Sequence, residues 1–212
     1  MITVTTLGNV PPFARGLMRD LRVRWALEEA GLAYETRLID SSIQASPDYR
    51  REQIFGQVPV LKDGDLTLFE SGAILLHIGG RCEALLPAQA EARARATAWV
   101  FAALNTVEVV VQQLAAIDLF YANEAWAQAR RPGVEAAVRQ RLGQLATWLG
   151  DKAHLEDRFT AGDLMMSNVL RNLRQTDLVA GEPNLAAYQQ RCEARPAFQR
   201  ALRDHMAVFE AA

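Results

Sequence analysis

The fold is decided by residues 55–72, which read FGQVPVLKDGDLTLFESG. Residues 58–61 are apolar and rich in β-branched side chains, which is typical of a short buried strand. Asp63-Gly64 is a strong signal for a tight turn between two strands, and the apolar residues after it supply the second strand. Behind Ser71, apolar side chains recur at the spacing of a helix. The stretch therefore predicts a strand, a tight turn, a second strand and a helix.

Two features of this stretch are unusual for a plain hairpin. Pro59 cannot donate a hydrogen bond within a sheet, so its strand lies at an edge there, or regular pairing begins after it. Spacing alone favours the common trans form of the Val58-Pro59 bond, although a cis bond would leave the backbone of Val58 open to a partner.

The second feature is the pair Glu70-Ser71 at the predicted helix start. A serine there can cap the helix, and the exposed amides of a helix start attract anions. The carboxylate of Glu70 could hold an ammonium group. The pair fits the head group of an amino acid, and the plain alternative is a capping serine beside a surface charge.

These motifs resemble the glutathione-binding half of the cytosolic glutathione transferase superfamily. The resemblance implies an α/β thioredoxin-like N-terminal domain with a mixed four-stranded sheet in βαβ–αββα order, followed by an all-α domain. It further implies that Pro59 is cis and shapes the site, and that the backbone of Val58 pairs with the cysteinyl part of glutathione, the co-substrate. Glu70 and Ser71 would hold the γ-glutamyl amine and carboxylate. Gln57 matches a family position that also contacts the tripeptide.

The composition is that of an ordinary soluble globular protein, with 50% hydrophobic and 23% charged residues among 212. The net charge of -2 gives no electrostatic reason to expect nucleic acid or an anionic membrane as a partner. Cys82 and Cys192 lie far apart without metal-ligand spacing, so we expect free thiols in a reducing cytosol and no metal. No run of apolar residues suggests a membrane span, and no export signal is visible.

The first part of the chain predicts the remaining elements of the sheet domain. We expect strands over 2–7 and 34–39, with a helix over about 17–30 between them, a short helix over 47–53 and a helix over 71–79. The helical crossover makes the first two strands parallel, and the tight turn makes the last two antiparallel.

Beyond about residue 82 the composition shifts to alanine and leucine. We expect three parts: a glutathione-binding domain over 1–82, a linker over 83–91 and an all-helical domain over 92–212. A long amphipathic helix should run from Ala88 to about Leu119, and Pro132 suits the first turn of the next helix.

The motif Phe159-Thr160-Ala161-Gly162-Asp163 predicts a structural helix start. Thr160 is in the N-cap position and Asp163 three residues later can complete a capping box. The family has the same box at its core C-terminal helix. Further helices are expected over 184–195 and from Pro196 onward.

The residue that would activate the thiol is missing. The family usually places a tyrosine, serine or cysteine between the first strand and helix, and residues 8–19 contain none of these. A thiol pKa near 8.5 must fall by about two units, which takes about 2.7 kcal/mol of thiolate stabilisation. The spacing of Arg15, Arg19 and Arg22 predicts that they share one helical face. Cations near the start of a helix are unfavourable because they oppose the helix dipole. This cost favours a functional role for them, at the thiolate or at the glycyl carboxylate. Solvated surface arginines are the alternative. We expect Arg15, and after it Asn9, to be catalytic.

The family resemblance also implies a cytoplasmic homodimer with a role in detoxification. Phe55 could insert into the neighbouring subunit, whereas His77 reads as a packed histidine rather than a base. The reaction would be addition or substitution of the glutathione thiolate on a small hydrophobic electrophile, or peroxide reduction. The missing hydroxyl also fits a non-catalytic glutathione- or ligand-binding relative. Residues 22–24 suit an isomerase of the maleylacetoacetate type, although the serine-rich run expected before them is absent.

Overall fold

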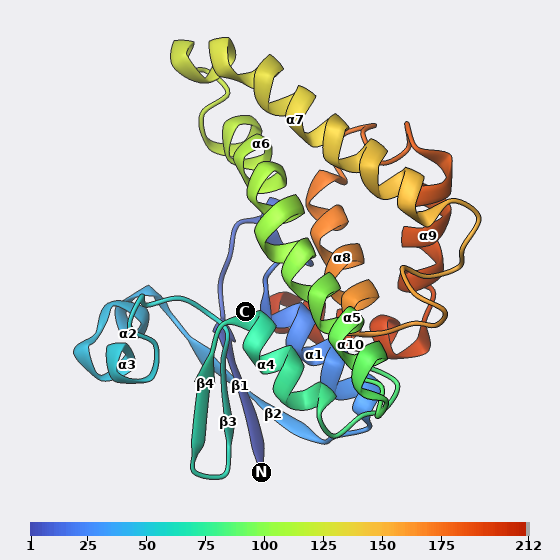
Figure 1. Ribbon diagram of the computed structural model, residues 1–212. Helices are drawn as coiled ribbons and strands as arrows, with labels where there is room; N and C mark the ends of the chain where they lie inside the picture. Colours follow the sequence, from blue (N-terminus) through green and yellow to red (C-terminus); the bar gives the residue numbers. More distant parts are fainter. Residues whose placement is uncertain (211–212) are drawn as a thin grey trace. The chain divides into compact units, whose positions relative to one another are not determined.

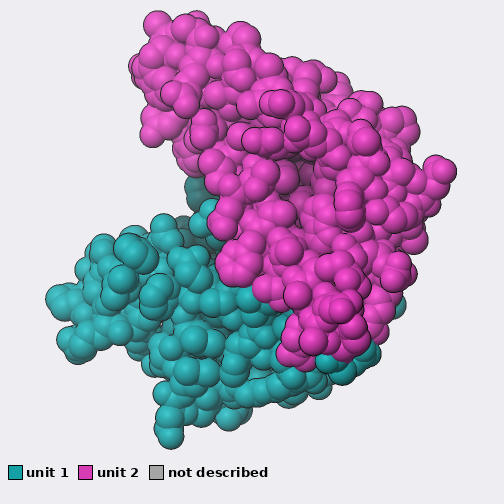
Figure 2. All heavy atoms as spheres, in the orientation of Figure 1, with its two compact units in different colours: residues 1–88, 194–212 teal, residues 89–193 magenta. Residues whose placement is uncertain are grey.

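The computed structural model describes residues 1–210, which fall into two compact units (Figure 2). Unit 1 contains residues 1–88 and the described part of 194–212, and unit 2 contains residues 89–193. This grouping differs from the expected division into 1–82, 83–91 and 92–212, because it places the last helix with the N-terminal residues. The expected limits themselves stay a prediction.

Unit 1 is built on a four-stranded sheet with the order β2-β1-β3-β4 (Figure 1). Its elements are β1 (Ile2–Leu7), η1 (Pro12–Ala14), α1 (Asp20–Ala30), β2 (Tyr34–Ile39), α2 (Ser41–Ala45), α3 (Pro47–Glu52), β3 (Val60–Asp63), β4 (Leu66–Phe69), α4 (Ser71–Gly79) and α10 (Pro196–Glu210). β1 pairs parallel with β2 and antiparallel with β3, and β3 pairs antiparallel with β4. The expected mixed α/β architecture is therefore confirmed, with α2 as an additional short helix.

The structure resolves the two readings of Pro59. The Val58-Pro59 bond is cis, as the family resemblance implied and spacing alone did not. Regular pairing of β3 begins at Val60, so the strand predicted over 58–61 starts two residues later than expected. Pro59 thus lies just before the ladder, where its missing N–H costs no sheet hydrogen bond.

Helices cover the sheet and hold the last helix in unit 1. α1 and α4 pack against each other and against strands of the sheet, and α10 packs on α1. The rings of Trp25 and Phe198 meet edge to face at 4.7 Å between centroids. Arg195, immediately before α10, donates two hydrogen bonds to Glu29 of α1, at 2.6 and 2.8 Å. Aromatic packing and a bidentate ion pair therefore fix α10 to α1.

Unit 2 is all helical, as expected for the C-terminal part. Its elements are α5 (Ala90–Ala102), η2 (Ala103–Glu108), α6 (Val109–Phe120), α7 (Ala125–Leu149), α8 (Ala161–Leu170), η3 (Arg171–Leu173) and α9 (Pro183–Glu193). The long helix predicted from residue 88 is continuous over 90–120, with a wider π turn over the six residues of η2.

The prediction that Pro132 begins a helix is wrong, because α7 begins at Ala125 and carries Pro132 in its interior. A proline there has no N–H for the preceding turn and costs about 3 kcal/mol. Arg131 beside it binds Asp118 of α6 and Glu135 of the next turn, each at 2.6 Å. The pair with Asp118 joins α7 to α6, and the pair with Glu135 spans Pro132 within α7.

The capping box of α8 is confirmed. Both carboxylate oxygens of the buried Asp163 accept hydrogen bonds, from the Leu155 and Thr160 amides at 2.8 and 2.9 Å and from the Tyr188 hydroxyl at 3.1 Å. Every residue of α8 is buried. Asp163 therefore has the structural role that the sequence predicted.

One helix exceeds the apolar length that the sequence reading allowed. Residues 90–120 include a window of mean hydropathy 1.6, long and apolar enough to cross a membrane by length and composition alone. The sequence has no unbroken apolar run of this length, whereas the window averages over interspersed polar residues. A single such helix is weak evidence for a span, since core helices pass the same test, and 39% of the window is buried within the protein.

Candidate functional site

The register of the sheet brings the predicted site residues to one end of it. Thr5 of β1 faces Val60 of β3, and Val60 faces Phe69 of β4. The chain after β1, the chain before β3 and the chain after β4 therefore meet at the same end of the sheet. This places the loop of residues 8–19 and segment 57–59 near Glu70 and Ser71.

The segment before β3 is held from within unit 1. Gln44 donates a hydrogen bond to the carbonyl of Gly56, and the hydroxyl of Tyr49 donates one to the carbonyl of Gln57, each at 2.7 Å. Burial, with the negative charge of Glu52, raises the pKa of Tyr49 to about 12, so the hydroxyl remains a donor at neutral pH. Val58 follows this anchored segment, half-buried and outside the strand ladder.

Glu70 has an unusual backbone conformation. Its φ of 69° and ψ of 114° make it the one non-glycine residue with positive φ among residues 1–210. Its exposed side chain makes no capping hydrogen bond. Such strain costs about 1–3 kcal/mol and is concentrated at functional sites.

The prediction that Ser71 caps α4 is wrong, because the helix already begins at Ser71 and Glu70 is in the N-cap position. The hydroxyl of Ser71 instead accepts a hydrogen bond from Nη1 of Arg22 at 3.3 Å. Arg22 lies on α1 and is 1% exposed. A buried cation and a helix N-terminus thus meet at Ser71, and both favour an anion there.

Arg15, Arg19 and Arg22 do not share a helical face, because only Arg22 lies within α1, so that prediction is also wrong. α1 begins only at Asp20, because η1 and the turn at Gly16, with φ 76°, interrupt the chain before it. Arg15 is half-buried in extended backbone after η1, with its guanidinium 5.5 Å from the Phe209 ring centre. Asn9 is exposed. Both remain predicted, untested catalytic residues.

Sequence reasoning missed a buried charged cluster beneath this loop. Asp20 and His205 are both fully buried, and Oδ2 of Asp20 lies 2.8 Å from Nε of Arg24 and 3.1 Å from Nδ1 of His205. Burial raises the pKa of Asp20, but the hydrogen bond from His205, with the hydrogen bond and charge of Arg24, outweighs burial and leaves this pKa below its ordinary value. The spacing of Asp20 and Arg24 could have indicated an i, i+4 pair, whereas nothing local pointed to His205.

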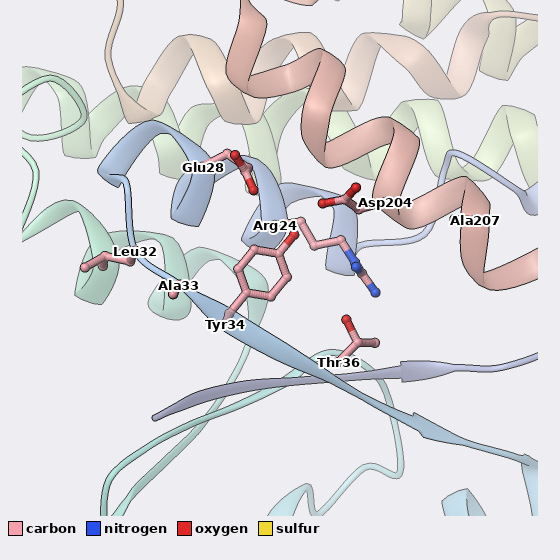
Figure 3. Close-up of a pocket in the computed structure, with 8 residues that line it drawn as sticks. All are labelled: Arg24, Glu28, Leu32, Ala33, Tyr34, Thr36, Asp204 and Ala207. Carbon is pink, nitrogen blue, oxygen red and sulfur yellow. The ribbon is translucent and has the colours of Figure 1, made fainter.

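A separate pocket of about 470 Å³ lies between α1, β2 and α10 (Figure 3). Its lining residues are Arg24, Glu28, Leu32, Ala33, Tyr34, Thr36, Asp204 and Ala207. None of these is a predicted site residue. Burial raises the pKa of the Tyr34 phenol, which the nearby charge of Arg24 opposes. Within residues 1–210, no cluster of three or more His, Cys, Asp or Glu side chains is arranged to hold a metal.

Known proteins resemble this chain over most of its length. A family model described as "Glutathione S-transferase, N-terminal domain" matches residues 13–80. Glutathione S-transferase 3 of Zea mays is 32% identical over 203 residues, which cover 85% of this chain and 86% of the relative.

Solved structures share the fold of this chain. Glutathione transferase F2 from Populus trichocarpa is 22% identical, covers 98% of this chain and 100% of its own, and gives a TM-score of 0.84. A glutathione transferase from Burkholderia graminis, solved with two glutathione molecules per subunit, is 26% identical with a TM-score of 0.82, covering 95% of this chain and 87% of its own.

Proposed function

The chain belongs to the glutathione transferase family, and from this premise we propose that it binds glutathione at Val58, Glu70 and Ser71 and transfers the thiolate to a small hydrophobic electrophile. The tripeptide is the co-substrate. Addition, substitution and peroxide reduction all use the same bound thiolate.

The strained backbone of Glu70 beside Ser71 is the observation that carries this proposal. The γ-glutamyl end of glutathione has an ammonium and a carboxylate on one carbon. The exposed carboxylate of Glu70 suits the ammonium, while the Ser71 hydroxyl, the N-terminus of α4 and the buried Arg22 suit the carboxylate. A zwitterion is thus matched charge for charge over two adjacent residues.

The backbone of Val58 would bind the cysteinyl part of the tripeptide in an extended, strand-like manner. Its position outside the ladder and next to the anchored Gln57 supports this role. The exposed side chain of Gln57 is available beside it for a further contact.

The sulfur would then face the loop of residues 8–19, from which we expect Arg15 or Asn9 to stabilise the thiolate. A guanidinium can supply the required stabilisation by charge and by hydrogen bonding. The hydroxyls of Thr5 and Thr6 are buried within the sheet, which argues against either as the donor.

We also propose a cytoplasmic homodimer in which Phe55 contacts the neighbouring subunit. Its side chain is 60% exposed although it is large and apolar, which suits a residue that a partner covers. The non-catalytic relative and the maleylacetoacetate-type isomerase remain the alternative functions.

Calorimetry with glutathione and turnover assays together test the proposal. The wild-type protein should bind glutathione and react it with chlorodinitrobenzene or cumene hydroperoxide. Binding without turnover of either would support the non-catalytic alternative, and turnover of a cis-diketo acid alone would support the isomerase. Asp65→Ala, which removes an exposed carboxylate from the same hairpin, is the control and should bind normally. Absence of binding by the wild type would overturn the assignment.

A further inference from the structure

The last helix reaches the loop that carries Arg15 through a buried histidine. The amide of Gly16 donates a hydrogen bond to Nε2 of His205 at 3.2 Å. On the other side of the ring, Nδ1 lies 3.1 Å from the carboxylate of Asp20. Both His205 and Asp20 are 0% exposed.

These two contacts show which nitrogen of the His205 ring carries the proton. Nε2 accepts from the Gly16 amide, so it carries no hydrogen, and Nδ1 must be the protonated nitrogen that donates to Asp20. Asp20 is held in turn by Arg24 one helical turn along α1. The imidazole is therefore fixed in tautomer and orientation, in the way that a carboxylate orients a functional histidine.

Arg15 itself rests on the same helix. Phe209 lies one turn after His205 on α10, with 5.2 Å between their ring centres. The guanidinium of Arg15 stacks over the Phe209 ring at 5.5 Å. One face of α10 thus contacts both Gly16 and Arg15.

α10 is a firm support for this contact. Besides the pair of Arg195 and Glu29, Arg200 of α10 binds Glu28 of α1 at 2.6 Å. His205 of this helix contacts the loop at Gly16. The φ of 76° at Gly16 sets the direction of the chain immediately after Arg15.

We propose that His205 is a positioning residue for the transferase reaction: it accepts the Gly16 amide and so holds Arg15 in the orientation that stabilises the glutathione thiolate. This inference rests on the proposed function, and in particular on Arg15 as the thiolate-stabilising group. His205 is buried and contacts neither substrate nor sulfur in this account.

Two substitutions separate the two ends of the ring. His205→Asn places an amide donor where Nδ1 faces Asp20 but offers no acceptor to Gly16. His205→Gln can place its amide oxygen where Nε2 accepts from Gly16. We expect His205→Asn to speed hydrogen exchange of the Gly16 amide at least tenfold and to raise the pKa of the bound glutathione thiol by about one unit, a tenfold loss of ionisation at a given pH. Glutathione Kd should change less than twofold, and His205→Gln should restore much of both effects.

A double-mutant cycle tests whether His205 acts through Arg15. Once Arg15 is alanine, adding His205→Asn should leave the thiol pKa unchanged. Additive effects, or equal effects of the Asn and Gln variants on exchange and thiol pKa, would overturn the proposal in favour of a merely structural role. If the wild type forms no bound thiolate, the proposed function fails, and the exchange of Gly16 alone then decides whether His205 holds the loop.

Discussion

Replacing Glu70 with glycine should stabilise the fold and weaken glutathione binding at once. Glu70 has φ of 69° and ψ of 114°, and glycine, which has no Cβ, adopts positive φ at a lower steric cost than glutamate does. The side chain of Glu70 is exposed and makes no capping hydrogen bond to α4, so the substitution removes no such hydrogen bond from the fold. The carboxylate that we assign to the ammonium of glutathione is lost with it.

The two effects have magnitudes that follow from this geometry. Relief of the backbone strain contributes about 1–3 kcal/mol, and the greater freedom of glycine in the unfolded chain removes about 0.4–1 kcal/mol. At the centres of these ranges, about 2 and about 0.7 kcal/mol, the free energy of unfolding should rise by about 1.3 kcal/mol. Each kcal/mol corresponds to roughly 2–4 °C in Tm for a chain of this size. Glutathione affinity should fall at least tenfold, or about 1.4 kcal/mol.

Glu70→Ala is the matched control, because it removes the same carboxylate but keeps a side chain in the strained conformation. Urea unfolding and calorimetry with glutathione should show an equal loss of affinity in both variants and a gain of stability only in the glycine variant. Equal stabilities would refute the strain argument. Unchanged affinity in both variants would refute the assignment of Glu70 to the ammonium group.

Three further substitutions test the other parts of the account. Arg15→Ala should raise the pH at which the bound thiolate absorbs in the ultraviolet, while the exposed Arg19→Ala should not; equal titrations of wild type and the Arg15 variant would remove Arg15 from the mechanism. Asp163→Ala leaves three buried donors without their acceptor and should lower the free energy of unfolding by about 3 kcal/mol or more in urea; a loss below about 1 kcal/mol would contradict the structural role of the capping box. Phe55→Ala should shift the dimer toward monomer in sedimentation, and an unchanged dimer would exclude Phe55 as a subunit contact.

Local signals in the sequence predicted much of the fold. The strands over 2–7 and 34–39 and the helix over 71–79 were predicted at their observed limits, because alternation and helical spacing are properties of adjacent residues. The capping box at Asp163 was found for the same reason. The position of Pro132 was predicted wrongly because local rules place a proline in the first turn of a helix. In the structure Pro132 lies inside α7, next to Arg131, which forms an ion pair with Asp118 of α6.

The sequence predicted less of the candidate site than of the fold. The cis bond before Pro59 followed from family resemblance, since spacing alone favoured trans. The contact of Arg22 with Ser71 joins residues 49 apart, and that of Gly16 with His205 joins residues 189 apart. No periodicity or cap motif carries information over such separations, so these partners emerged only with the tertiary structure.

A crystal structure of the protein with glutathione would show directly whether the tripeptide occupies the proposed site. We expect the γ-glutamyl group on Glu70 and Ser71, with the cysteinyl backbone hydrogen-bonded to Val58. Glutathione bound elsewhere, for example in the pocket beside Arg24 and Tyr34, would contradict this expectation.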